Sequence, residues 1–133
     1  MIDIENEIFS RVANELRAQY PGIAVYGEEQ RSPSHFPCVT VIEADNVTTI
    51  TTLSSSITEK YSDVMYEINV YSNQSTGRKS ECKRIFATID DILIRLNFTR
   101  MMRSPVSMED TTIYRMTGRY VARVDDKQTI YRR

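Results

Sequence analysis

The strongest pattern in the chain is an apolar stripe between residues 82 and 96. Its members recur at steps of three and four, the spacing that places side chains on one side of an α-helix. The stripe consists of Cys82, Ile85, Phe86, Ile89, Ile92, Leu93 and Leu96. We therefore predict an amphipathic helix that is capped by Ser75 or Thr76 and ends at Asn97. Such a helix must bury its apolar side against another element of the fold.

A second helix is predicted near the start of the chain, over residues 3–20. Its apolar stripe follows four-residue steps and consists of Ile4, Ile8, Val12 and Leu16. Asp3 is placed to cap the first turn, and Pro21-Gly22 ends the helix. Each predicted helix thus has one apolar side to bury and one polar side to leave in water.

The other patterned segments predict strands. Between residues 60 and 72, four apolar residues alternate with mostly polar ones, which is typical of a strand with one buried side. These four are Val64, Tyr66, Ile68 and Val70. The remaining predicted strands span residues 23–26, 37–45, 98–103 and 112–124. Ser104-Pro105 is expected to end the strand over 98–103.

These elements follow one another in the order α-β-β-β-α-β-β and fit a single domain, residues 1–133. The predicted fold class is α+β. We expect a two-layer sandwich with a mostly antiparallel sheet of about five strands and both helices on one face. Connections of hairpin length favour antiparallel pairing, while the second helix leaves room for one parallel crossover.

Two segments are too polar to contribute to this core. Residues 46–58 are rich in Ser and Thr, and we expect a mobile loop or a protruding hairpin that orders against a partner. Residues 125–133 are predicted to form a flexible, solvated tail.

The charge of the chain argues against several classes of partner. Lys and Arg total 17 and Asp and Glu total 18. A net charge of -1 gives no electrostatic reason to expect nucleic acid or an anionic membrane as the main partner. No apolar run approaches the roughly 18 residues of a membrane-spanning helix, and the acidic start is unlike a signal peptide. We expect a protein of cytosol-like surroundings, with reduced cysteines.

The charges are unevenly divided along the chain. Residues 1–76 hold four basic and eleven acidic side chains, whereas residues 77–133 hold thirteen basic and seven acidic ones. If the fold places the two halves at opposite edges, copies can associate head to tail and close into a ring. If strands from the two halves interleave, the charges neutralise one another locally. The sequence leaves both arrangements open.

Groups suited to catalysis or metal binding are sparse. His35 is the only histidine, and no Cys or His lies at ligand spacing from it. Cys38 and Cys82 fall at a predicted strand start and on a helix stripe, where a cysteine is usually a small buried hydrophobe. We therefore predict no metal site, no cofactor and no catalytic residue.

Two further motifs have ordinary explanations. The neighbouring acids Asp90-Asp91 and Glu109-Asp110 are expected to lie on the surface, because adjacent side chains point in different directions. Gly77-Arg78-Lys79-Ser80 lacks the earlier glycine of a phosphate-binding loop and is expected to start a helix. Neither motif indicates an enzyme.

A row of arginines is the most informative polar pattern. Arg115, Arg119 and Arg123 fall on one side of the last long strand, with successive members about 13 Å apart. The row has three possible partners: phosphate groups of nucleic acid, an acidic surface of another protein, or Asp63 and Glu67 on a neighbouring strand. We treat it as a candidate partner interface.

Several segments together resemble a known family over nearly the whole chain. They include Phe36-Pro37-Cys38-Val39, Val64-Met65-Tyr66-Glu67-Ile68-Asn69-Val70-Tyr71-Ser72-Asn73, Thr76-Gly77-Arg78-Lys79-Ser80-Glu81 and Ile113-Tyr114-Arg115-Met116-Thr117-Gly118-Arg119-Tyr120, with residues 1–7, 20–23 and 98–100. The whole pattern resembles the small tail-completion or tail-terminator proteins of long-tailed bacteriophages, also described as minor capsid proteins. No catalytic signature is part of this resemblance.

The resemblance implies a structural role in the virion. It implies a ring, usually a hexamer, that caps the completed tail tube at its head-proximal end and offers the surface to which the filled head docks. The implied partners are other copies of the chain, the tail tube protein and the head–tail connector. DNA would pass through the lumen without being read, and assembly would take place in the host cytoplasm.

If the chain has this structural role, the candidate partner interface combines the arginine row with threonines of the 46–58 segment. The threonines are Thr48, Thr49, Thr51 and Thr52. Two alternatives stay open: a head-side connector or stopper protein, and a small-ligand-binding or enzymatic α+β domain.

Overall fold

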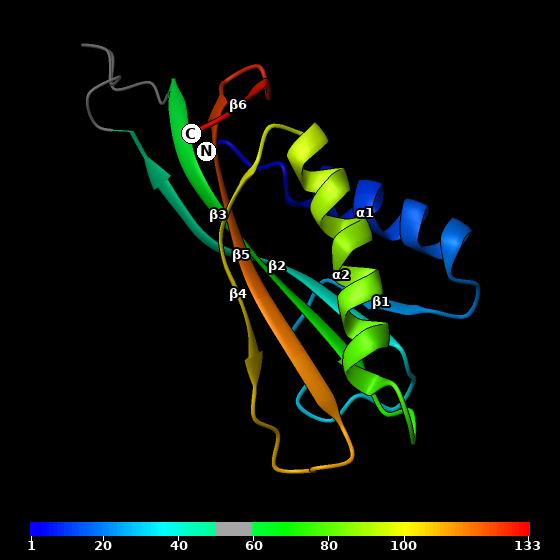
Figure 1. The fold of residues 1–133 in the computed structure, drawn as a ribbon. Coiled ribbons are helices and arrows are strands. Elements are labelled where there is room, and N and C mark those ends of the chain that lie inside the picture. Colours follow the sequence, from blue (N-terminus) through cyan, green and yellow to red (C-terminus); the bar gives the residue numbers. More distant parts are fainter. Residues whose placement is uncertain (50–59) are drawn as a thin grey trace.

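The computed structural model describes residues 1–49 and 60–133, which form one sheet with two helices on one face (Figure 1). Within these residues the elements, in chain order, are α1 (Glu5–Gln19), β1 (Ala24–Tyr26), β2 (Cys38–Thr48), β3 (Tyr61–Ser72), α2 (Arg78–Arg95), β4 (Thr99–Val106), β5 (Tyr114–Asp125) and β6 (Ile130–Tyr131). The class is α+β, as the sequence predicts. The order differs from the prediction by the short strand β6 at the end of the chain.

The strands form one mixed sheet in the order β1-β2-β3-β5-β4, and β6 pairs with the far end of β5. β1 and β2 are parallel, whereas the other pairs in the described residues are antiparallel. α2 connects β3 to β4, which run in the same direction with β5 between them. The sheet is therefore mostly antiparallel, and its parallel pair lies at the β1 edge.

The core lies between the helices and the sheet. α1 packs against β2 and α2, while α2 packs against β3, β5 and β4. The inward helix side chains Ile8, Val12, Leu16, Ile85, Phe86, Ile89 and Leu93 and the strand side chains Val64, Tyr66, Ile68 and Val70 are all buried. These residues are the ones for which helical spacing and strand alternation predict burial, and that prediction is confirmed.

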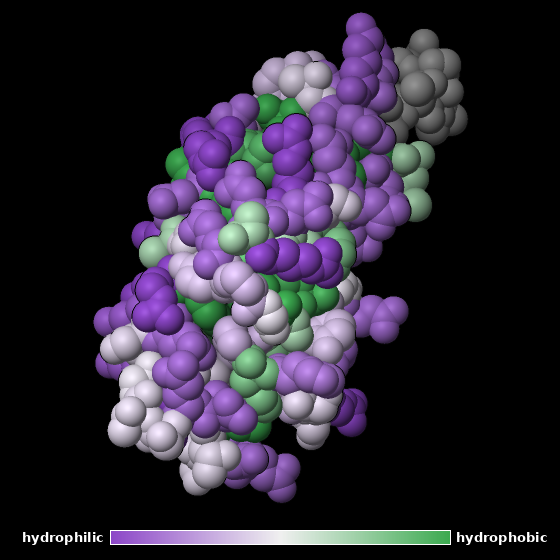
Figure 2. All heavy atoms as spheres, turned by 90° about the vertical axis from the view of Figure 1, so that its right-hand side faces the viewer, coloured by the Kyte–Doolittle hydropathy of each residue, from purple (hydrophilic) through white to green (hydrophobic). Residues whose placement is uncertain are grey.

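Hydrophilic residues cover most of the outer surface of the helix layer. Figure 2 shows this side of the molecule, with apolar residues visible only between the hydrophilic ones. Among the residues of α2, Ile94 is an apolar side chain that stays 36% exposed. The polar sides of both helices thus face water, as their patterns predict.

The start of α2 differs from the prediction. Its N-cap residue is Gly77, with φ 79°, and no side chain caps the helix. A cap by Ser75 or Thr76 is therefore wrong. The left-handed conformation at this position favours glycine, which explains why the helix starts after Gly77. The end of α2 is as predicted, since Asn97 has a left-handed φ of 69° just after the helix.

The strand β4 also continues further than the sequence predicts. It runs through Ser104-Pro105 to Val106, and Pro105 is paired in register with Met116 of β5. β4 is an edge strand, and an edge strand tolerates proline because one side of its backbone has no neighbour in the sheet. A proline breaks an inner strand but not this one.

The structure describes the two segments predicted to lie outside the core to different extents. Residues 46–48 belong to β2, and residues 50–58 lie outside the described residues. Residues 125–133 are not the featureless tail that the sequence predicts. They form a turn and β6, the Asn97 side chain donates a 3.0 Å hydrogen bond to the Ile130 carbonyl, and Arg132 donates one of 3.0 Å to the Phe98 carbonyl. Backbone pairing with β5 holds this segment in place.

Candidate interaction surface

The side of the sheet turned away from α1 and α2, here called the open face, carries the arginine row. Strand alternation places its side chains there because their sequence neighbours, such as Tyr120 and Ala122, are buried under the helices. On β3 the polar side chains of the open face are Asp63, Glu67 and Asn69, and on β5 they are Arg115, Thr117, Arg119 and Arg123. The antiparallel register sets Glu67 opposite Arg119 and Asp63 opposite Arg123.

Each arginine of the row contacts β3. Arg119 Nη2 lies 3.2 Å from Glu67 Oε1, and Arg123 Nε lies 2.9 Å from Asp63 Oδ1. Arg115 Nε donates a 3.0 Å hydrogen bond to Asn69 Oδ1, and its guanidinium lies 5.5 Å from the centre of the Tyr71 ring. Of the three possible partners for the row, the structure shows the one within the same sheet.

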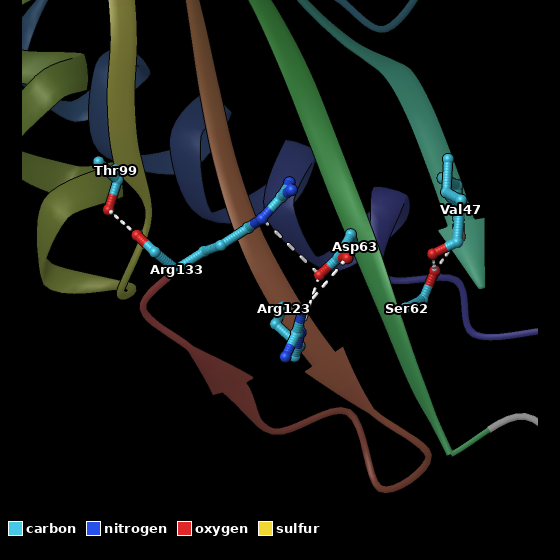
Figure 3. Close-up of polar contacts among 7 residues, drawn as sticks. Val47, Ser62, Asp63, Thr99, Arg123 and Arg133 are labelled. Atoms are coloured by element: carbon cyan, nitrogen blue, oxygen red, sulfur yellow. Dashed lines mark hydrogen bonds and ion pairs between the residues drawn. The ribbon is translucent and has the colours of Figure 1, made fainter. Parts of the chain in front are cut away.

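The Asp63 carboxylate receives two arginines (Figure 3). Arg123 reaches it from β5, and Arg133 Nε lies 4.0 Å from Oδ1. Thr99 Oγ1 donates a 3.1 Å hydrogen bond to the Arg133 carbonyl, which holds the last residue beside β4. The hydrogen bond from Arg123 lowers the pKa of the Asp63 carboxyl; burial partly opposes this, and the charge of Arg133 lowers it further.

These ion pairs leave the guanidinium groups accessible. The side chains of Arg119 and Arg123 are 49% and 41% exposed, whereas Glu67 and Asp63 are 24% and 19% exposed. Exposed pairs of this kind contribute about 0.2–1 kcal/mol each to stability. The carboxylates are largely covered, so the open face presents mainly arginine to a partner.

The threonines of the candidate interface are only partly described. Thr48 ends β2 and is half-buried, Thr49 is buried, and Thr51 and Thr52 lie outside the described residues. Thr48 is in register with Ser62, the neighbour of Asp63. The structure therefore brings Thr48 and Arg123 to the same end of the sheet, while Arg115 lies at the other end.

The residues considered for catalysis do not come together. His35 is exposed, and its Nδ1 lies 3.0 Å from Ser34 Oγ. Burial raises the pKa of Cys38 to about 11 and that of Cys82 to about 12. Within residues 1–49 and 60–133, no group of three or more His, Cys, Asp or Glu side chains is arranged to hold a metal ion.

One acid that the sequence places on the surface has a specific contact. Asp90 on α2 accepts hydrogen bonds from Tyr120 Oη at 2.6 Å and from Arg100 Nη1 at 2.9 Å. Its carboxylate therefore links α2 to β5 and β4. The sequence carried a signal for this contact, because Tyr120 lies on the buried side of β5 and a buried hydroxyl needs a partner. Glu109 and Asp110 are exposed, as predicted.

The described residues also form a surface cavity lined by charged side chains. A cavity of about 520 Å³ opens between residues 29–33 and 107–113. Its lining includes Glu29, Arg31, Glu109 and Arg115. These side chains combine both signs of charge at the surface. In the described part of the chain, no helix is long and apolar enough to cross a membrane.

The strand order separates the charged halves of the chain in space. β1, β2 and β3 come from residues 1–76 and lie together, and β5 and β4 come from residues 77–133. The two halves meet where β3 pairs with β5 and where α2 packs on α1 and β3. Ion pairs at these contacts, Glu67–Arg119 and Asp63–Arg123 on the open face and Glu15–Arg95 between the helices, neutralise part of the charge. The two outer edges remain unlike. The edge strand β4 carries arginines and no acid.

Neither a family model nor a curated protein matches this chain.

Proposed function

We propose that this protein is a tail terminator of a long-tailed bacteriophage, a structural protein that caps the completed tail tube and presents a surface to the head. The observation that carries the proposal is the separation of charge across one sheet, with acidic side chains toward the β1 edge and arginines on β4. Unlike edges attract, and a head-to-tail contact that repeats by rotation closes into a ring.

The chemistry of the surface supports a structural rather than an enzymatic role. The two thiols are buried, and the histidine is exposed beside a serine. An adaptor of this kind needs surfaces for the tail tube protein, the head–tail connector and other copies of itself. It needs no cofactor, and DNA passes through the lumen of the ring without base-specific contacts.

The open face is the proposed contact surface for the tail tube or connector, and Arg115, Arg119 and Arg123 are its proposed contact residues. Replacing Arg119 by Glu places two carboxylates opposite each other and destabilises the fold as well as the contact. The exchanged variant Arg119→Glu/Glu67→Arg keeps an ion pair with its direction reversed. Loss of tail binding by this folded variant separates the partner role from the internal one.

Complementation of terminator-deficient tails tests the function. Tail tubes assembled without a terminator are expected to become uniform in length and competent for head joining when this protein is added, as measured by electron microscopy. Binding to filled heads but not to tubes would assign the protein to the connector or stopper class instead. Binding to neither would reject the virion role and leave a small-ligand-binding domain as the alternative.

A further inference from the structure

A groove lies along the acidic edge of the sheet, between the first turns of α1 and the segment that follows β1. It has a volume of about 380 Å³. Phe9, Tyr26 and Val41 supply its apolar lining, and Glu5 and Glu28 supply two carboxylates. We call this site the α1–β1 groove. An apolar lining flanked by carboxylates suits an unbranched apolar side chain next to a cation.

The local structure explains why the groove is open. β1 pairs with only three residues of β2, ending at Tyr26 opposite Thr40. Val41 follows Thr40 in β2. Beside Val41, the chain after Tyr26 no longer pairs with β2. Further along β2, the Glu43 backbone N–H donates a 2.9 Å hydrogen bond to Glu5 Oε2, so a side chain of α1 takes the position of a strand neighbour. The early end of β1 leaves the groove between α1 and the β1 edge.

The opposite edge of the same sheet exposes a segment of matching chemistry. β4 has no strand on its outer side within the described residues, and Met101 and Met102 are 60% and 37% exposed. Met101 lies at a β-bulge between Arg100 and Met102, a feature that redirects side chains at sheet edges. We call residues 100–103 the methionine–arginine segment. Exposed neighbouring methionines on an edge strand are typical of a contact surface.

At each of these two sites, one charged side chain makes no ion pair with the described residues. Arg103 and Glu28 are exposed and make no ion pair within residues 1–49 and 60–133, whereas Arg100 pairs with Asp90 at 2.9 Å. Arg103 lies in the methionine–arginine segment, and Glu28 lines the α1–β1 groove. The groove and the segment are thus complementary in both polarity and charge.

We propose that the α1–β1 groove binds the methionine–arginine segment of a second copy of this chain. In this contact Met101 enters the apolar lining and Arg103 of one copy pairs with Glu28 of the next. The two surfaces lie at opposite edges of one sheet, so the contact is heterologous and each copy uses both surfaces (Figure 1). The inference rests on the proposed ring and names the surfaces that would form it.

Site-specific disulfide formation tests the contact directly. Glu28→Cys and Met101→Cys proteins are prepared separately, mixed and oxidised, with and without tail tubes. Native Cys38 and Cys82 are buried and stay outside the reaction. The mixture is expected to give a mixed dimer, and the double variant a ladder of linked oligomers. Asp91→Cys on the exposed side of α2, combined with Met101→Cys, is the matched control and is expected to give no ladder.

Charge exchange provides an independent test. Arg103→Glu and Glu28→Arg are each expected to weaken association about tenfold, because each sets like charges against each other. Both changes in one chain are expected to restore association, since the pair forms again in the opposite sense. Lys83→Glu, on the exposed surface of α2, is the control and should leave association unchanged. Sedimentation at several protein concentrations measures all four variants.

The outcomes distinguish the contact from the proposed function. No mixed disulfide under either condition, or no restoration in the exchanged variant, would overturn the contact. Disulfide formation between Glu28→Cys and the tail tube protein alone would also overturn it and assign the groove to that partner. A disulfide ladder from a protein that fails to complete tails would support the contact and reject the terminator role. Completed tails from a Glu28→Cys/Met101→Cys protein that forms no disulfide ladder would support the terminator role and reject the contact.

Discussion

The hydroxyl of Tyr120 donates a 2.6 Å hydrogen bond to Oδ1 of Asp90, from the buried side of β5 to the inner side of α2. Tyr120 is fully buried, and Arg100 donates to the same carboxylate oxygen from β4. Burial is the main cause that raises the pKa of Tyr120, with the hydrogen bond to Asp90 second. The phenol is therefore protonated near neutral pH and acts as the donor in this hydrogen bond.

Removing this hydroxyl is expected to destabilise the protein. Tyr120→Phe leaves Asp90 without one of its two donors, and we expect a loss of about 1–3 kcal/mol in the free energy of unfolding. Urea denaturation measures the change. Tyr131→Phe is the control: its hydroxyl donates to Asp125 at 3.0 Å, but Tyr131 is 44% exposed, so water replaces the lost bond. Equal losses in the two variants would show that the Tyr120 contact is worth no more than a surface contact.

Truncation on α2 tests which side of the helix is buried. Ile89 is fully buried, whereas Ile94 on the same helix is 36% exposed. Ile89→Ala is expected to cost about 2–5 kcal/mol of unfolding free energy, because it leaves a cavity in the core. Ile94→Ala is expected to change it by less than about 0.5 kcal/mol. Similar melting temperatures for the Ile89→Ala variant and the unaltered protein would contradict the packing of α2 on the sheet.

The glycine in the middle of β5 is required by close packing. A Cβ atom at Gly118 would collide with the ring of Phe86 and lie 3.1 Å from the Met102 carbonyl oxygen. Gly118→Ala is therefore expected to destabilise the protein by about 1–3 kcal/mol. At Gly27 the nearest atom to an added Cβ is Phe9 Cδ2 at 3.6 Å, an ordinary contact, so Gly27→Ala serves as the control. Thermal unfolding that ranks the two variants in the opposite order would disprove this account.

The Asp63–Arg123 pair predicts a dependence of stability on acid pH. The pKa of Asp63 is lowered in the folded state from its ordinary value of 3.8. The pair therefore adds stability above that value and loses its contribution as the pH falls through the lower folded-state pKa. Asp63→Asn is expected to lose about 0.2–1 kcal/mol near neutral pH, and the difference from the unaltered protein should vanish in acid.

A double-mutant cycle controls for the loss of the side chain itself. Arg123→Gln should show the same pH dependence as Asp63→Asn, and the double variant should lose little more than either single variant. Urea denaturation across the acid range measures each variant. A difference that persists unchanged at low pH would mean that the ion pair is not its cause.

The two cysteines are expected to be unreactive in the folded protein. Both are fully buried, and burial raises the pKa of each thiol, to about 11 for Cys38 and about 12 for Cys82. Little reactive thiolate forms below those values. A thiol-specific chromogenic reagent at mildly alkaline pH should label neither cysteine until urea is added, and then both. Rapid labelling of one thiol without urea would show that its site opens.

Periodic patterns in the sequence determined the local structure and the core. The steps of three and four along residues 82–96 and the alternation along 60–72 identify the buried sides correctly, because burial repeats with the geometry of the helix and strand. Alternation also predicts the side of the strand on which each charged residue lies, but the pairing of these residues depends on β3 and β5 being neighbours in the sheet. Asp63 and Glu67 lie on the open face of β3, and Arg119 and Arg123 lie on the open face of β5.

Tertiary structure decided which strands lie at the edges of the sheet. The features that the local patterns did not predict follow from that arrangement. Pro105 is compatible with β4 only because β4 is an edge strand, and residues 130–131 become β6 only because the end of β5 has an open side. The position of Glu28 across the sheet from Arg103 likewise depends on strand order. Strand order is set by contacts between residues distant in the chain, and no local spacing in the sequence records those contacts.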